Sequence, residues 1–177
     1  MRYIKLIFFF IIHYDCFILF SLWRKKIIKS SALKHVIIYK NTTCAIEKLS
    51  KIIIHSGSLA INKPWFKKDP FPTFLTLHAG SIIDVNGIFA FYPSSRITLS
   101  YNARLSLGSG YANMGLNLCC FNKISIGKNV AISENVTIRD SDNHSIVSHA
   151  HTQTSPVLRL LHMPEHHRRQ ILPTWPV

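Results

Sequence analysis

Residues 126–143 read IGKNVA, ISENVT and IRDSDN, three consecutive frames of six that each begin with isoleucine. The fifth position of the first two frames is valine. Residues 99–110 carry the same frame upstream as LSYNAR and LSLGSG, with leucine first and a small residue fifth. Between Tyr111 and Cys120 the register slips. A repeat of six is therefore the dominant period of this part of the chain.

A period of six suits a coil with three flat faces, because each face needs one inward aliphatic side chain and a small residue near the corner. Three faces give roughly 18 residues per coil, and coils stack by parallel strand pairing until a continuous core is buried. Six steps along an α-helix turn a side chain through about 600°, so helical packing would not keep these residues on one face. The repeat predicts an all-β chain with a left-handed parallel β-helix over residues 81–146. A β-sandwich with coincidental spacing stays as the alternative.

The composition changes along the chain and divides it into three parts. Residues 1–33 are apolar and then basic, residues 34–147 are expected to form the β-helix domain, and residues 148–177 are expected to be an irregular tail. Short β-branched runs at 36–39 and 52–54 predict strands. The segment NKPWFKKDPFP, residues 62–72, has three prolines and predicts a loop that leaves one coil.

The first part of the chain raises the question of a membrane. Residues 4–23 are rich in Ile, Leu and Phe and are followed by the basic triplet 24–26, which is the length and flank of a membrane span. However, Asp15 lies in the middle, where a charge is unfavourable by roughly 2.5–3.5 kcal/mol. Three alternatives stay open: an apolar helix or extended segment packed on the domain, the same segment at a membrane surface, or a membrane anchor. A cleavable signal peptide is disfavoured because no small-residue cleavage site follows.

The charge and the cysteines limit the partners and the compartment. The chain has 21 Lys and Arg against 8 Asp and Glu, a formal charge of +13, which favours anionic partners. Nucleic acid is not expected among them, because the basic residues are scattered and no binding motif accompanies them. The four cysteines contain no CxxC pair, and the adjacent Cys119 and Cys120 are poorly placed to bridge. Reduced thiols in a cytoplasmic protein are expected, with association with the inner membrane left open.

Residues 108–146, GSGYANMGLNLCCFNKISIGKNVAISENVTIRDSDNHSI, resemble the core of hexapeptide-repeat O-acetyltransferases. The likeness is to the capsular and exopolysaccharide type and, more distantly, to maltose and galactoside acetyltransferases, and it extends back through residues 89–110. It implies direct transfer of an acetyl group from acetyl-CoA to a sugar hydroxyl of a surface polysaccharide or its precursor. It also implies a homotrimer with sites at subunit interfaces and no metal. Because transfer is direct, Cys119 and Cys120 are expected to be small inward residues and not nucleophiles.

The resemblance also implies the site residues. His144 matches the general base that takes a proton from the acceptor hydroxyl, a task for which the near-neutral pKa of histidine is suited. Asp140 and Asp142 could orient that imidazole or bind the sugar, with solvated turn carboxylates as the alternative. Asn113 in YANM falls where the family contacts the acceptor sugar, and an asparagine that stabilises a turn is the alternative. Glu134 is expected to be an exposed turn residue.

The sequence departs from that family after Ile146. Family members continue with coils that build the coenzyme A cleft. Residues 148–177 contain no further frame of six, and they contain five histidines. The HAH and EHH runs lack the spacing of a zinc motif, and a truncated or frame-shifted end is the preferred interpretation. Two functions therefore stay open: an acetyltransferase weakened or inactivated by truncation, and a non-catalytic β-helix remnant that serves as a binding or assembly module.

Overall fold

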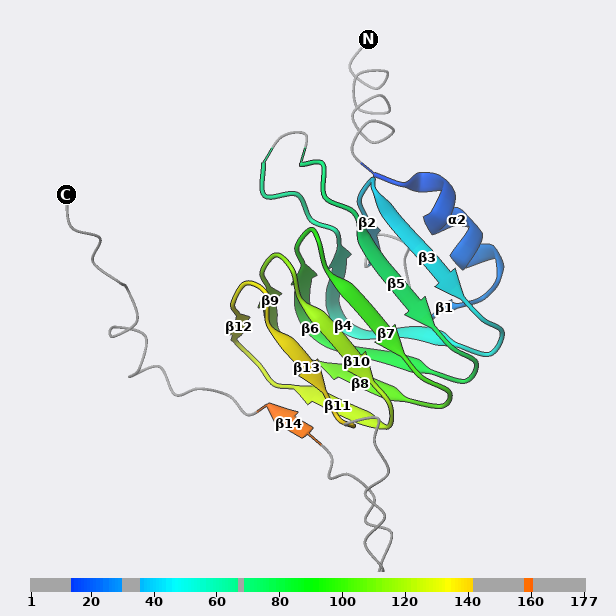
Figure 1. Cartoon of the computed structure of the whole chain (residues 1–177). Helices are drawn as coiled ribbons and strands as arrows, with labels where there is room; N and C mark the ends of the chain where they lie inside the picture. The colour runs from blue at the N-terminus through cyan, green and yellow to red at the C-terminus, as the bar shows by residue number, and fades with distance from the viewer. Residues whose placement is uncertain (1–13, 30–35, 67–68, 142–157, 161–177) are drawn as a thin grey trace, which may run out of the picture.

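The computed structural model describes residues 14–29, 36–66, 69–141 and 158–160 (Figure 1). Within these residues one helix is followed by strands, of which β4 and β6 are the longest. The elements are α2 (Cys16–Arg24), β1 (Ile28–Lys29), β2 (Val36–Ile38), β3 (Thr42–Ile46), β4 (Lys51–Ile61), β5 (Thr73–Leu77), β6 (Ile82–Phe91), β7 (Arg96–Leu99), β8 (Arg104–Leu107), β9 (Gly110–Ala112), β10 (Asn117–Cys120), β11 (Lys123–Ile126), β12 (Val130–Ile132), β13 (Thr137–Arg139) and β14 (Leu158–Leu160).

The strands form three parallel ladders that the chain visits repeatedly in the same order. One ladder is the sheet β3-β5-β7-β10-β13. The second sheet contains the other two ladders, because the long strands β4 and β6 take part in both: the first half of β6 pairs with β8 and its second half pairs with β9. Beyond them β11 pairs with β8, and β12 pairs with β9. The described chain is thus an all-β stack of coils with parallel pairing between neighbours, as Figure 1 shows.

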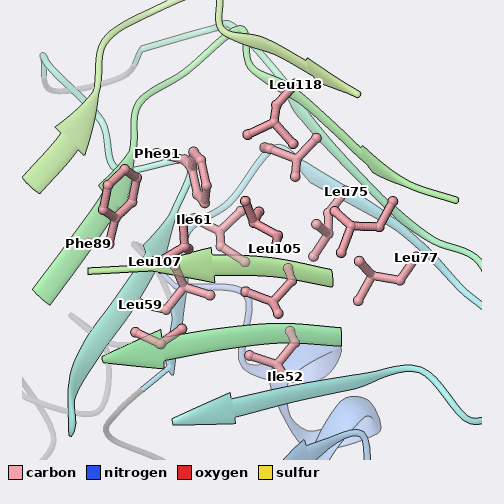
Figure 2. Close-up of a cluster of buried hydrophobic side chains, with 14 of the residues drawn as sticks. Ile52, Leu59, Ile61, Leu75, Leu77, Phe89, Phe91, Leu105, Leu107 and Leu118 are labelled. Atoms are coloured by element: carbon pink, nitrogen blue, oxygen red, sulfur yellow. The ribbon is translucent and has the colours of Figure 1, made fainter. Parts of the chain in front are cut away.

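The inward side chains form columns that run through the stack. Ile97 pairs with Leu118, and Leu118 pairs with Ile138, with all three side chains buried. The first positions of the six-residue frames, expected to point inward, are all buried: Leu99, Leu105, Ile126, Ile132 and Ile138. Figure 2 shows such side chains from different strands meeting in one interior, where the rings of Phe89 and Phe91 lie 5.2 Å apart. The inward role of the repeat is therefore confirmed.

The coils are longer than the expected 18 or so residues, and their corners differ in length. Leu105 pairs with Ile83, 22 positions earlier, and with Ile124, 19 positions later. The turn between β7 and β8 comprises residues 100–103, whereas the turn between β10 and β11 comprises only residues 121–122. Because a shorter corner shifts every later inward position, unequal corners explain why the six-residue frame slips in the sequence.

Glycines fill one corner of the stack, where neighbouring coils approach most closely. Gly57 pairs with Gly87 at the point where β4 turns from one ladder to the next. A Cβ on Gly87 would lie 2.6 Å from the carbonyl oxygen of Gly108, and a Cβ on Gly108 would collide with the carbonyl of Gly127. This corner therefore excludes side chains and keeps the backbones of successive coils in contact.

The regions outside the repeat match the expectations in part. The strands predicted at 36–39 and 52–54 are confirmed and correspond to β2 and β4. The loop predicted at 62–72 is also confirmed, except at residues 67–68, which lie outside the described residues. In the expected irregular tail, β14 pairs in parallel with β11 and so adds one strand to the stack. The helix α2 begins at the N-cap Asp15, whose side chain accepts a hydrogen bond from the amide of Ile18 at 3.0 Å. Among the described residues no helix has the length and apolarity to cross a membrane.

The inward columns predict the cost of a single truncation. We expect Leu105→Ala to lower the free energy of unfolding by about 2–5 kcal/mol, because the buried side chain leaves a cavity between Ile83 and Ile124. The neighbouring outward residue offers a matched control, since Ser106→Ala should change stability by no more than about 0.5 kcal/mol. Denaturant unfolding of both variants measures the difference, and equal effects would contradict the inward column.

Candidate functional site

The structure describes two of the four predicted site residues, Asn113 and Asp140, and places them apart. His144 and Asp142 lie outside the described residues, so their predicted roles stay predictions. Asn113 follows β9 and Asp140 follows β13, so they lie at different corners of the stack. The described part of the chain therefore does not bring them together in one site.

Asp140 is bound to the backbone of the preceding coil. Its side chain is only 6% exposed. One carboxylate oxygen accepts a hydrogen bond from the amide of Phe121 at 2.6 Å, and the other accepts from the amides of Asn122 at 2.8 Å and Lys123 at 2.6 Å. These amides form the short turn between β10 and β11, so the carboxylate stabilises the corner that shifts the repeat. Asp140 thus has a structural role, and its contact with a substrate stays a prediction.

Asn113 lies half-buried at the surface and is paired with Glu134 of the next coil. Its side-chain oxygen accepts from the amide of Met114 at 3.0 Å, and its side-chain nitrogen donates to Glu134 Oε1 at 3.2 Å. Glu134 is exposed, as expected for a turn residue. A small open pocket of about 270 Å³ adjoins the pair and is lined by Phe71, Ser94, Met114, Gly115, Glu134 and Asn135.

Three aromatic rings lie at the same corner of the stack as this pair and contact one another. The rings of Tyr92 and Tyr111 meet edge to face with centroids 5.9 Å apart, and Trp65 meets Tyr92 in the same manner at 5.0 Å. Tyr92 lies one coil before Asn113 in the same corner, because its amide donates to the carbonyl of Ala112. We call the set Trp65, Tyr92, Tyr111, Asn113 and Glu134 the aromatic corner.

The aromatic corner combines apolar rings with hydrogen-bonding groups, the two kinds of group that protein surfaces use to bind carbohydrate. The exposed rings of Trp65 and Tyr111 present apolar surface on which the C–H face of a sugar ring can lie, whereas the ammonium of Lys63 lies over the ring of Tyr92. The Asn113 amide both donates and accepts, and the Glu134 carboxylate accepts, which are the functions needed for sugar hydroxyls. Asn113 was predicted as a sugar contact from the resemblance, whereas Trp65 and Tyr92 were not predicted. The proline-rich excursion 62–72 was the only signal for Trp65, and nothing in the sequence placed it against Tyr92.

Each of the two histidines in the described part of the chain lies within hydrogen-bond distance of a carboxylate, and neither pair was predicted from the sequence. His78 Nδ1 lies 2.9 Å from Glu47 Oε1, and the other Glu47 oxygen accepts from the amide of Ala79 at 3.0 Å. His55 Nε2 lies 3.1 Å from Asp84 Oδ1. A carboxylate that fixes one imidazole nitrogen leaves the other for proton transfer, so such a pair is a possible base. The members of each pair come from neighbouring coils, about 30 residues apart, and no local motif announces them.

The state and burial of the cysteines bear on whether one of them could act as a nucleophile. All four are free thiols. Cys120 is buried in the core as expected, and burial, followed by the nearby charge of Asp140, raises its pKa to about 12. Such a thiol stays protonated and unreactive at neutral pH. Cys119 is only half-buried, so the expectation that it too points inward is wrong, because side chains alternate along β10. In the described ranges no cluster of three or more histidine, cysteine or carboxylate side chains could hold a metal.

The structural role of Asp140 can be measured. We expect Asp140→Ala to lower the free energy of unfolding by on the order of 3 kcal/mol, because three amides of a buried turn lose their acceptor. Glu134→Ala removes an exposed carboxylate of another turn and should cost no more than about 0.5 kcal/mol. Denaturant unfolding of both variants checks this, and a fully stable Asp140→Ala protein would refute the role.

The His78–Glu47 pair predicts a pH effect. The hydrogen bond from His78, followed by that from the Ala79 amide, lowers the pKa of Glu47. The stabilisation from this carboxylate is therefore present above the ordinary glutamate pKa and is lost as the pH falls through the lowered value. We expect His78→Ala to raise the pKa of Glu47. The pH dependence of the Glu47 carboxyl carbon resonance measures this change. His55→Ala is the control and should leave that pKa unchanged, and a shift of the same size in both variants would contradict the pairing.

No family model matches the chain, and neither the curated proteins nor the solved structures contain a match to it. Its function is therefore inferred from the sequence pattern and from the geometry of the aromatic corner.

Proposed function

We propose that the coil stack is a left-handed β-helix and that the chain is an acetyl-CoA-dependent O-acetyltransferase acting on a sugar hydroxyl of a surface polysaccharide or its precursor. One observation supports this most: Asn113, which the resemblance implies contacts an acceptor sugar, donates to an exposed carboxylate at the corner of the stack that also holds the contacting rings of Trp65, Tyr92 and Tyr111. Apolar ring surface near groups that donate and accept hydrogen bonds suits a sugar, which has an apolar C–H face and polar hydroxyls. The parallel coils supply a rigid support for it.

The proposed reaction is direct transfer. His144 takes the proton from the acceptor hydroxyl, the hydroxyl oxygen attacks the thioester carbonyl, and a tetrahedral oxyanion forms. Collapse of this intermediate breaks the carbon–sulfur bond, and the proton passes to the departing thiolate of coenzyme A. Backbone amides of the turns are suited to stabilise the oxyanion. The reaction needs no metal, and a homotrimer would place the donor between subunits.

The net charge of +13 supports the donor part of the proposal. Coenzyme A carries several phosphate charges, and a strongly basic chain attracts such a ligand from solution. Asp142 is proposed to orient His144 or to bind the sugar.

A second candidate is a sugar-binding or assembly module without catalysis. It is favoured by the aromatic corner itself, which can bind a sugar with described residues alone and needs neither coenzyme A nor His144. The two candidates share the sugar site and differ in the transfer step.

Thiol release from acetyl-CoA in the presence of a panel of sugars tests the proposal. We expect release that depends on both substrates and falls by about 10²–10⁴-fold in His144→Ala, because a general base is lost. Asn113→Ala should raise the KM for the sugar about tenfold and leave kcat nearly unchanged, since one hydrogen bond to a neutral group is removed.

The controls separate the two candidates. Ser106→Ala, a change at an outward residue of β8, should release thiol at the normal rate. Sugar binding by calorimetry without any thiol release from a folded protein would favour the binding module. Normal release from His144→Ala would reject His144 as the base.

A further inference from the structure

One face of α2 is apolar, aromatic and open to solvent. The side chains of Phe17, Phe20 and Trp23 are 83%, 56% and 51% exposed. Their spacing of three places them on one side of the helix, and the rings of Phe20 and Trp23 lie 6.1 Å apart. Isolated exposed apolar residues are common, but three adjacent aromatic rings form a patch that calls for a partner.

The opposite face of the same helix is fixed to the domain. Leu22 is 5% exposed and belongs to the core, and Ile18 and Leu19 pack against it. The helix covers the first coil, beside β2 and β3, at the end of the stack away from β13 (Figure 1). Because one face stays in the core, the helix presents its aromatic face as a fixed surface of the domain.

Lysines surround an apolar groove next to the C-terminal end of α2. Its volume is about 890 Å³, and it lies between the segment after the helix and the turn that joins β3 to β4. The basic lining residues are Lys25, Lys26, Lys48 and Lys51, and the apolar ones are Ile27, Ile46, Leu49 and Ala79. Ser50 and a single carboxylate, that of Glu47, complete the lining, and Glu47 is paired with His78. Arg24 ends the helix, and with Lys29 it adds exposed positive charge nearby.

Leu49 in this turn is strained as well as exposed. Its φ is 66° and its side chain is 79% exposed. The matching turns of the next two coils have Gly80 and Asn102 at positive φ, residues that adopt this conformation readily. A leucine gains nothing there from the fold, since its side chain is in water, so its apolar side chain is best explained by a ligand.

We propose that the Phe17, Phe20 and Trp23 face of α2, together with the lysine groove and Leu49, docks the domain onto the surface of an anionic phospholipid bilayer. The aromatic rings and Leu49 enter the boundary between headgroups and acyl chains, as interfacial helices do. The lysines bind the lipid phosphates. The inference is independent of the proposed acetyl transfer.

Charge favours a bilayer over a second copy of the chain. A symmetric dimer through this face would place two grooves of four lysines each in one interface, and the chain as a whole carries +13. Like charges across a desolvated interface are strongly unfavourable. An anionic bilayer complements both the charge and the aromatic rings.

Co-sedimentation of the full chain with vesicles tests this. We expect binding to vesicles of equal parts phosphatidylcholine and phosphatidylglycerol, and at least tenfold weaker binding to phosphatidylcholine alone. The variants F17S/F20S/W23S and K25E/K26E should each lose about tenfold or more, and Leu49→Ser should lose less. These side chains are exposed, so the variants should fold normally, which circular dichroism checks. The matched control Ile88→Ser with Lys123→Glu changes an exposed apolar and a basic residue elsewhere and should bind normally.

Fluorescence gives a second readout. In a chain with Trp65→Phe and Trp175→Phe, we expect the emission of Trp23 to shift to the blue on addition of anionic vesicles. The proposal is overturned by equal binding to neutral vesicles, by normal binding of F17S/F20S/W23S or of K25E/K26E, or by an unshifted Trp23. It is also overturned by a dimer in solution that F17S/F20S/W23S dissociates, which would show that a second copy covers the face.

Discussion

Parallel pairing between successive coils is the constraint on which the rest of the structure depends. It places each inward side chain above its counterpart one coil away, as in the column of Ile97, Leu118 and Ile138. A strand residue cannot change its register without moving its whole ladder out of the core. The turns at the corners lie outside the ladders, so insertions, aromatic rings and charged groups are accommodated there. The aromatic corner, the His78–Glu47 pair and the Asp140 turn all lie at corners for this reason.

The local part of the fold was predictable because it depends on residues close in sequence. Alternation within a strand and a repeat of six identified Leu105, Ile126 and Ile132 as inward residues, and all three are buried. The coil length was not predictable, because it depends on corner lengths that vary without a strong signal. A two-residue turn at 121–122 is possible where a buried carboxylate binds its amides, and that carboxylate comes from Asp140 of the next coil. The sequence alone indicated an acidic residue in a turn and could not show to what it is bound.

The same limit applies to the candidate site. Asn113 was predicted through its local motif, and its site role stays a prediction. Its partner Glu134 lies 21 residues away, and His78 lies 31 residues from Glu47. Such pairs are neighbours only because one coil separates them, so they cannot be recognised until the coil length is known. Trp65 is harder still, since it belongs to an excursion between β4 and β5 whose path no periodicity describes.

The first coil needs a cover, and this requirement connects the fold to the proposed bilayer surface. A stack of coils ends in unpaired strands and an open core, which favour association unless another element lies over them. Here α2 covers the first coil with Leu22, yet it is apolar on its outer face as well. A helix that served only as a cap would be polar outside. The aromatic outer face of α2 therefore requires an explanation beyond the fold. The aromatic corner lies elsewhere, on coils further along the stack. Because the two surfaces use different residues, the domain could bind a bilayer and a sugar at the same time.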